Sequence, residues 1–291
     1  MTTVIDRTLD LLAPPLPPVD DRTRTEVRDR LVATLAPLME QLPPGDQVVV
    51  NPALLRLARS DPQQLAGADE PFAWKPAFAR RSLGLAVVSA GASGRFRTPA
   101  DAVGPVAAEA VDQWKRTGWR TFHWEPWLAG LPTGARAAVL ADALTWATAL
   151  WSSFDWRALP APAQIGGVDD QWICPAVRTM RLKARAELRV PLTGPRGGGA
   201  PGRCPPPGPA LVSVSGGCPG DGWPDELGYL ALVAGLRSPT RPVPSRVLGL
   251  WPDAGFHSSV EVDREVLLGA VDRVVATVTA VVGARRAASV G

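Results

Sequence analysis

The sequence predicts an α/β protein in which a helical N-terminal half packs on a small mixed β-sheet core with flanking helices. Before about residue 157, apolar residues recur at the three- and four-residue spacing of a helix face. From about residue 177 the spacing changes to two, which is the period of a half-buried strand. Strands then alternate with helices to the C-terminus, as expected for a sheet covered by helices.

The composition is that of an ordinary globular chain, because 46% of the 291 residues are hydrophobic and 20% are charged. The net charge of +3 is too small to indicate a partner by itself. Three cysteines and two histidines lack the clustering of a zinc site. We find no signal peptide and no apolar stretch of the roughly 20 residues that a membrane helix needs. We therefore expect a cytoplasmic protein without a membrane partner.

Helices account for most of the N-terminal half, and the residue types in their first turns indicate where they begin. Thr23 and Glu26 have the spacing of a capping box, and Thr98 with Asp101 forms an N-cap with an early acid. The apolar run at 48–50 is either a strand or a buried connector. The predicted helices start near Thr23, Pro52, Pro76, Thr98 and residue 133.

Eight of the eleven tryptophans lie between Trp74 and Trp156. Such a density of aromatic rings could form a surface on which nucleobases stack. It could equally form the contacts between helices, because each ring buries a large apolar area. Trp114 and Trp146 lie on the apolar faces of their helices, which favours packing.

The second half contains the clearest strand of the chain, from Thr179 to Val190, where apolar and charged residues alternate. The segment 193–209 is rich in glycine and proline and is predicted to be a flexible loop. We then expect a strand at 210–215, a helix at 224–236, a strand at 246–251 and a helix from Asp263. The chain thus divides into a tryptophan-rich helical region at 1–157 and an α/β core at 170–286, unless both form one continuous domain.

Three segments of this core have the order and spacing of a known set of motifs. They are Ala184-Arg185-Ala186-Glu187 on the first strand, Leu211 to Gly217 on the second, and Glu226 to Ala231 on the following helix. In this order they resemble the RecB-like branch of the PD-(D/E)XK nuclease superfamily. That family has Gly-x-x-Asp, Asp/Glu-x-Lys-Thr-Gly and Gln-x-x-x-Tyr at these places. The resemblance covers about residues 178–283 and implies a restriction-endonuclease-like fold.

The resemblance also implies a metal-dependent nuclease site from which most charged residues are missing. In the family, two carboxylates hold the divalent metal and the lysine orients the attacking water. Ser213 stands at the carboxylate position and Ser215 at the lysine position, so both positions are degenerate. Glu187 remains on its strand, with Asp225 and Glu226 at the helix. The resemblance therefore implies a catalytically degenerate member for which no cofactor is expected.

We favour a non-catalytic nuclease-fold protein that binds DNA or RNA or is a subunit of a DNA-processing assembly. One face of the clearest strand is basic and could follow several phosphates of a nucleic acid. Its residues are Arg181, Lys183, Arg185 and Arg189, opposed by Glu187. The same face could also be solvated and balanced by acids from elsewhere.

Two alternatives remain open. The first is an active nuclease whose ligands have migrated, in which Glu187 and Asp221 would hold Mg²⁺ or Mn²⁺ and Asp225 and Glu226 would lie beside them. Asp225 and Glu226 can equally be acids that the helix dipole favours in a first turn. The second alternative is a scaffold whose tryptophan-rich half docks a protein partner on an exposed apolar patch.

Overall fold

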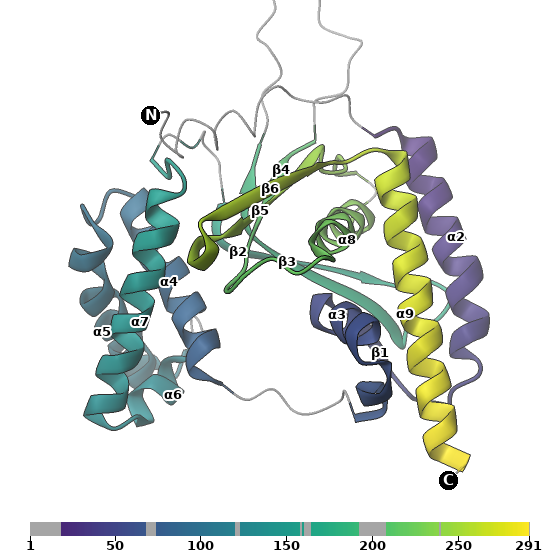
Figure 1. Cartoon of the computed structure of the whole chain (residues 1–291), viewed down its shortest axis with the longest axis horizontal. Coiled ribbons are helices and arrows are strands. Elements are labelled where there is room, and N and C mark those ends of the chain that lie inside the picture. Colours follow the sequence, from purple (N-terminus) through teal and green to yellow (C-terminus); the bar gives the residue numbers. More distant parts are fainter. Residues whose placement is uncertain are drawn as a thin grey trace, which may run out of the picture.

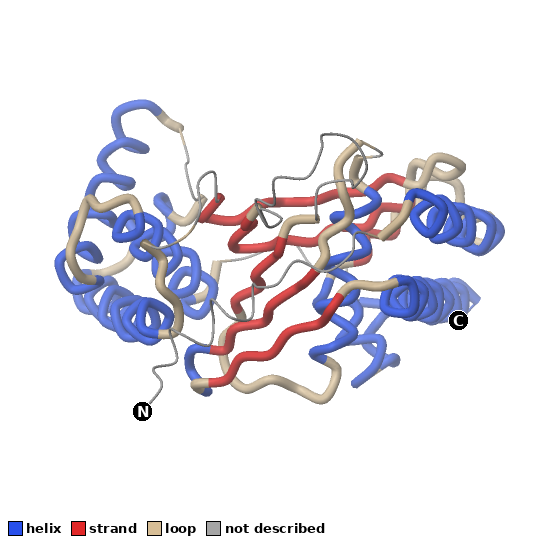
Figure 2. Tube along the Cα trace, turned by 90° about the horizontal axis from the view of Figure 1, so that it is seen from above, coloured by secondary structure: helices blue, strands red, loops and turns tan. Residues whose placement is uncertain are grey.

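The computed structural model describes residues 19–67, 74–119, 123–157, 159, 164–191, 208–238 and 240–290. Within these residues the chain is an α/β protein with eight α-helices and a six-stranded mixed sheet, which confirms the predicted class. The sheet lies between two groups of helices (Figures 1 and 2). Most of the predicted loop at 193–209 lies outside the described residues.

The sheet has the strand order β2-β3-β4-β5-β6, in which β4 and β5 are parallel and the other neighbours are antiparallel. The short strand β1 pairs in parallel with the first residues of β3, whereas β4 pairs with its last residues. Because β2 occupies the other edge of β3, residues 183–187 lie between β1 and β4 on a divided edge. The strands are β1 Val48–Val50, β2 Gln164–Ile173, β3 Met180–Val190, β4 Ala210–Val214, β5 Arg246–Trp251 and β6 Phe256–Glu261.

Seven of the eight helices described begin close to where the sequence predicts them, and the short helix at Glu125–Gly130 was not predicted. The N-cap at Thr98 is confirmed, and the structure shows that Asp101 completes a capping box with it. The capping box expected at Thr23 is wrong. Asp20 caps that helix instead, and its side chain accepts a 2.7 Å hydrogen bond from the N–H of Thr23. The helices are α2 Asp21–Met39, α3 Pro52–Ser60, α4 Pro76–Ala92, α5 Pro99–Thr117, α6 Glu125–Gly130, α7 Thr133–Ser152, α8 Trp223–Leu236 and α9 Arg264–Val290, with 3₁₀ turns at Pro62–Gly67 and Pro252–Ala254.

Two apolar cores cover the two faces of the sheet. Leu211 and Val247 pack with α2, α8 and α9, whereas Val212 and Val214 pack with α4, α5 and α7. In Figure 1, α4–α7 form the bundle on the left, and α2 and α9 lie together on the right. The second core also takes in Trp124, Trp146 and Trp156, each at most 2% exposed. The packing interpretation of the tryptophans is confirmed for these three.

One helix in the described part of the chain, Arg264–Ala288 of α9, is long and apolar enough to cross a membrane. Asp272 and Arg273 interrupt its apolar residues, in line with the sequence expectation for the apolar stretches of this chain. Half of its most apolar segment is buried, where α9 packs on α2 and α8. A core helix of a folded domain meets the same criteria of length and hydropathy.

Candidate functional site

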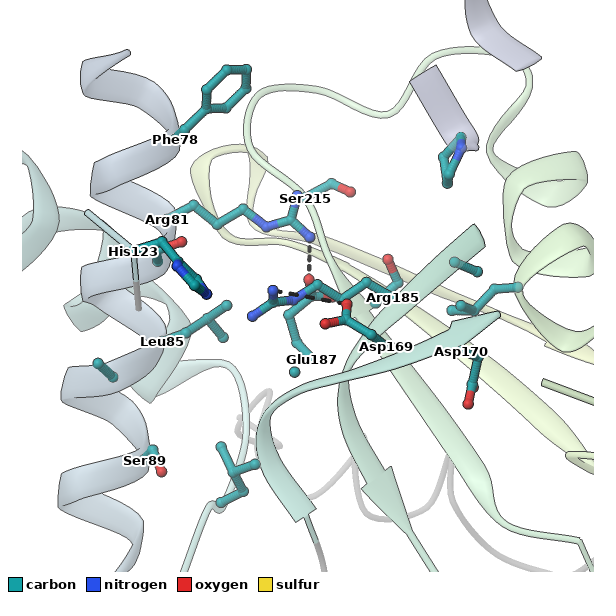
Figure 3. A pocket seen from close by; sticks show the side chains of 18 of the residues that line it. Phe78, Arg81, Leu85, Ser89, His123, Asp169, Asp170, Arg185, Glu187 and Ser215 are labelled. Atoms are coloured by element: carbon teal, nitrogen blue, oxygen red, sulfur yellow. Dashed lines mark hydrogen bonds and ion pairs between the residues drawn. The ribbon is translucent and has the colours of Figure 1, made fainter. Parts of the chain in front are cut away.

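A cleft of about 1550 Å³ lies between α4 and the strands β2 and β3, and the start of α8 and α3 close its other side (Figure 3). It is the place where the helical bundle and the divided edge of β3 face each other. Cations and carboxylates are present in its lining in equal number. The cations are Arg56, Arg81, Arg95, Lys183 and Arg185, and the carboxylates are Glu109, Asp169, Asp170, Glu187 and Glu226.

Glu187 lies on the inner wall of this cleft and has both carboxylate oxygens engaged. Its side chain is only 1% exposed. Arg81 of α4 donates to Oε1, and the backbone N–H of Val214 donates to Oε2 at 2.8 Å. A buried carboxylate is stable only when it is paired and hydrogen-bonded, and these two contacts supply what Glu187 needs.

Ser213 and Ser215 lie beside Glu187, as the alternation of the strands predicts. Leu188 of β3 and Val212 of β4 are the last pair of their ladder, and Glu187 and Ser213 follow them directly on the two strands. Both serines are half-buried and line the cleft. Glu226 lines the same cleft from α8. The structure thus places Glu187, both serines and Glu226 in the lining of one cleft.

The other carboxylates do not join this group. Asp225 pairs with Arg273 of α9 at 3.3 Å and lines a separate, smaller cavity. Asp221 is exposed and does not line the cleft. Glu226 pairs with Arg56 of α3; burial raises the pKa of its carboxyl, and Arg56 opposes that shift. No three His, Cys, Asp or Glu side chains within the described ranges cluster so that they could hold a metal ion.

The basic strand face forms only in part. Lys183 and Arg185 line the cleft, with Arg185 3.9 Å from Asp169 of β2. Arg189 instead turns to Asp170 of β2 at 2.7 Å and is only 12% exposed; burial lowers its pKa and Asp170 opposes this. Arg181 is half-buried and does not line the cleft. Of the four predicted residues, Lys183 and Arg185 therefore line the cleft, and Arg181 and Arg189 do not.

Several residues of the site were not predicted from the sequence. Arg81 is one, although an Arg-Arg pair in the otherwise apolar helix α4 is a visible signal. Asp170 is another: its side chain is fully buried, and its two oxygens pair with Arg189 and with Arg237 at the end of α8. This pairing ties β2, β3 and α8 together beside the cleft.

Aromatic side chains line the cleft on both sides. Trp74, Phe78 and His123 lie towards the helical bundle, and Figure 3 shows Phe78 and His123 on either side of Arg81. Phe78 is 45% exposed. Trp223 and Trp251 lie towards α8 and β5, with ring centroids 6.1 Å apart. The cleft thus offers flat apolar faces beside its cations.

A divalent metal needs several oxygen ligands, usually including more than one carboxylate. At the place where the resemblance would put the metal, no three His, Cys, Asp or Glu side chains of the described residues come together, and a guanidinium already contacts Glu187. The residues present therefore do not fit a resident metal ion. No family model matches the chain, and no curated protein or solved structure matches it either.

Proposed function

We propose that the protein is a non-catalytic, nuclease-like protein that binds a single strand of nucleic acid in the cleft between α4 and β3. The observation that carries this proposal is the state of Glu187. This carboxylate is buried, bonded to Arg81 and to the backbone of Val214, and has a neutral serine as its neighbour on β4. Such a carboxylate holds the structure together and is not available as a metal ligand.

The absence of cutting follows from the chemistry of phosphodiester hydrolysis. Metal-assisted hydrolysis needs a metal that activates water and stabilises the developing negative charge. Ser213 and Ser215 cannot supply a carboxylate or a cation at neutral pH. Their hydroxyl groups can still donate hydrogen bonds to a phosphate oxygen. The wall that would position a metal is therefore suited to holding a phosphate without breaking it.

The lining of the cleft supports a single strand as the ligand. Lys183 is exposed there and has no ion pair within the part of the chain that the structure describes. The negative charge of Asp170, one of the carboxylates in the lining, is offset by Arg189 and Arg237, which do not line the cleft. Phe78 and Trp223 present rings on opposite sides, and unpaired bases stack on such rings whatever their sequence.

The proposal predicts that reversing the charge of Lys183 weakens binding. Lys183→Glu takes away a cation that faces a phosphate and adds a repulsive charge, so we expect about a tenfold decrease in affinity for a fluorescent single-stranded oligonucleotide. The salt dependence of binding should also become shallower, by about 0.7 in the slope of the logarithmic plot for each phosphate that the protein no longer neutralises. Fluorescence anisotropy at several salt concentrations measures both quantities.

Arg178→Glu is the matched control, because Arg178 is exposed in the turn before β3 and does not line the cleft.

When the same oligonucleotide is incubated with Mg²⁺ or Mn²⁺, the wild-type protein should cleave no more of it than the Glu187→Ala variant does. Cleavage that Glu187→Ala abolishes would replace the proposal with the metal-dependent nuclease. An equal decrease in Lys183→Glu and Arg178→Glu would show that the cleft is not the binding site.

The scaffold alternative has less support. It predicts an exposed apolar patch on the tryptophan-rich half of the chain. Among the large hydrophobic side chains described there, Phe78 and Trp119 are the exposed ones. Phe78 lines the cleft and Trp119 follows α5, so they come from different elements.

A further inference from the structure

We infer that Arg81 is a resident cation that takes the place of the metal and holds one phosphate of the bound strand. This inference rests on the proposed function and assigns its central contact. In a metal-dependent site the positive charge beside the carboxylate belongs to the metal. Here the positive charge beside Glu187 belongs to the guanidinium of Arg81, which α4 brings to the sheet.

The geometry leaves Arg81 able to bind a second anion. A guanidinium has five N–H donors, and the bond to Glu187 involves one nitrogen, Nη2. The Arg81 side chain is 38% exposed and lines the cleft. Figure 3 shows Ser215 beside the guanidinium of Arg81, with Glu187 on its other side. Arg81 and the hydroxyl group of Ser215 therefore form a set of donors suited to one phosphate, with Ser213 in the lining of the same cleft.

Glu187 sets the strength of this site, because its negative charge offsets the positive charge of Arg81. Replacing Glu187 with Gln removes the charge and keeps the shape. The amide oxygen of Gln can still accept from the N–H of Val214, and the amide nitrogen, which is a donor, then faces Arg81. The guanidinium therefore loses its bond to residue 187 and keeps its full charge for the ligand. Glu187→Gln should therefore bind the strand more tightly than the wild-type protein does.

The experiment compares affinities of one fluorescent single-stranded oligonucleotide, measured by anisotropy without divalent metal. We expect Glu187→Gln to bind about fivefold more tightly, with a steeper salt dependence. The double variant Arg81→Ala with Glu187→Gln should bind about tenfold more weakly than the wild-type protein. The double variant is used because Arg81→Ala alone would leave a buried carboxylate unpaired and could unfold the protein.

Arg80→Ala is the matched control on the same helix, because Arg80 pairs with Asp253 at 3.1 Å and does not line the cleft. Its affinity should equal that of the wild-type protein. Unchanged or weaker binding by Glu187→Gln would overturn the inference, as would full affinity in the double variant. If Lys183→Glu still binds more weakly in that case, the proposed function stands without the inference. No binding by the wild-type protein would end both.

Discussion

At the scale of single residues, Asp170 shows what the site needs in order to stay folded. Its side chain is fully buried, and each carboxylate oxygen meets the guanidinium of a different arginine, from β3 and from α8. Removing one member of a buried ion pair leaves the remaining charges without compensation. Two guanidinium groups would then lie close together, with no carboxylate between them.

Asp170→Ala should therefore lower the free energy of unfolding by about 3–5 kcal/mol. Asp169→Ala is the control, because the Asp169 side chain is 78% exposed and lies 3.9 Å from Arg185. Its effect should stay below about 1 kcal/mol, as for other exposed pairs. Urea unfolding followed by tryptophan fluorescence measures both variants. Similar losses of stability in the two variants would show that Arg189 and Arg237 do not need the charge of Asp170 in order to keep their places in the folded protein.

Strand alternation predicts which residues of the site share a face, but it does not predict their partners. Ser213 and Ser215 lie on the face opposite Val212 and Val214, as their spacing of two requires. The partner of Glu187 comes from a helix 106 residues away in the chain. Nothing in the local pattern relates these two residues, because only the packing of α4 on the sheet brings them together.

At the scale of elements, the helices and the central strands were predictable and the outer strands were not. The helices and β3 have strong periodicity, which local sequence displays. β2 contains two glycines and two aspartates, so it lacks the alternation and the residue types typical of strands. β6 has half-buried residues on both faces, so it has no clear apolar side. Pairing with β3 and β5 makes these segments strands.

The crossing of α4 and α7 depends on a glycine. A Cβ atom on Gly84 would lie 2.3 Å from Cε3 of Trp146, which is nearly fully buried. Gly84→Ala should therefore destabilise the protein by about 1–3 kcal/mol through overpacking. Gly269→Ala in α9 is the control, since no atom lies within 4 Å of its Cβ position. It should stabilise the helix by up to about 1 kcal/mol. Thermal unfolding of both variants tests this contrast, which would be absent if α4 and α7 could move apart.

At the scale of the whole molecule, the helical half and the α/β core pack against each other through several of their elements. Val48 of β1 pairs with Met180 of β3, and the Tyr229 hydroxyl of α8 donates to the carbonyl of Val50 at 2.8 Å. Helix α2 packs along α9. On the other face, the bundle of α4, α5 and α7 covers Val212 and Val214 of the sheet. Residues of both halves line the cleft.

These contacts predict that the chain does not fold in two independent parts. A fragment of residues 164–291 would lack β1, α2 and α4, and would expose apolar residues on both faces of its sheet. We expect such a fragment to show no cooperative thermal transition by circular dichroism, whereas the full chain shows one. Adding a fragment of residues 1–157 should restore the transition, because the missing apolar surfaces then meet. A fragment 164–291 that unfolds cooperatively at the temperature of the full chain would instead show that the core is a domain of its own.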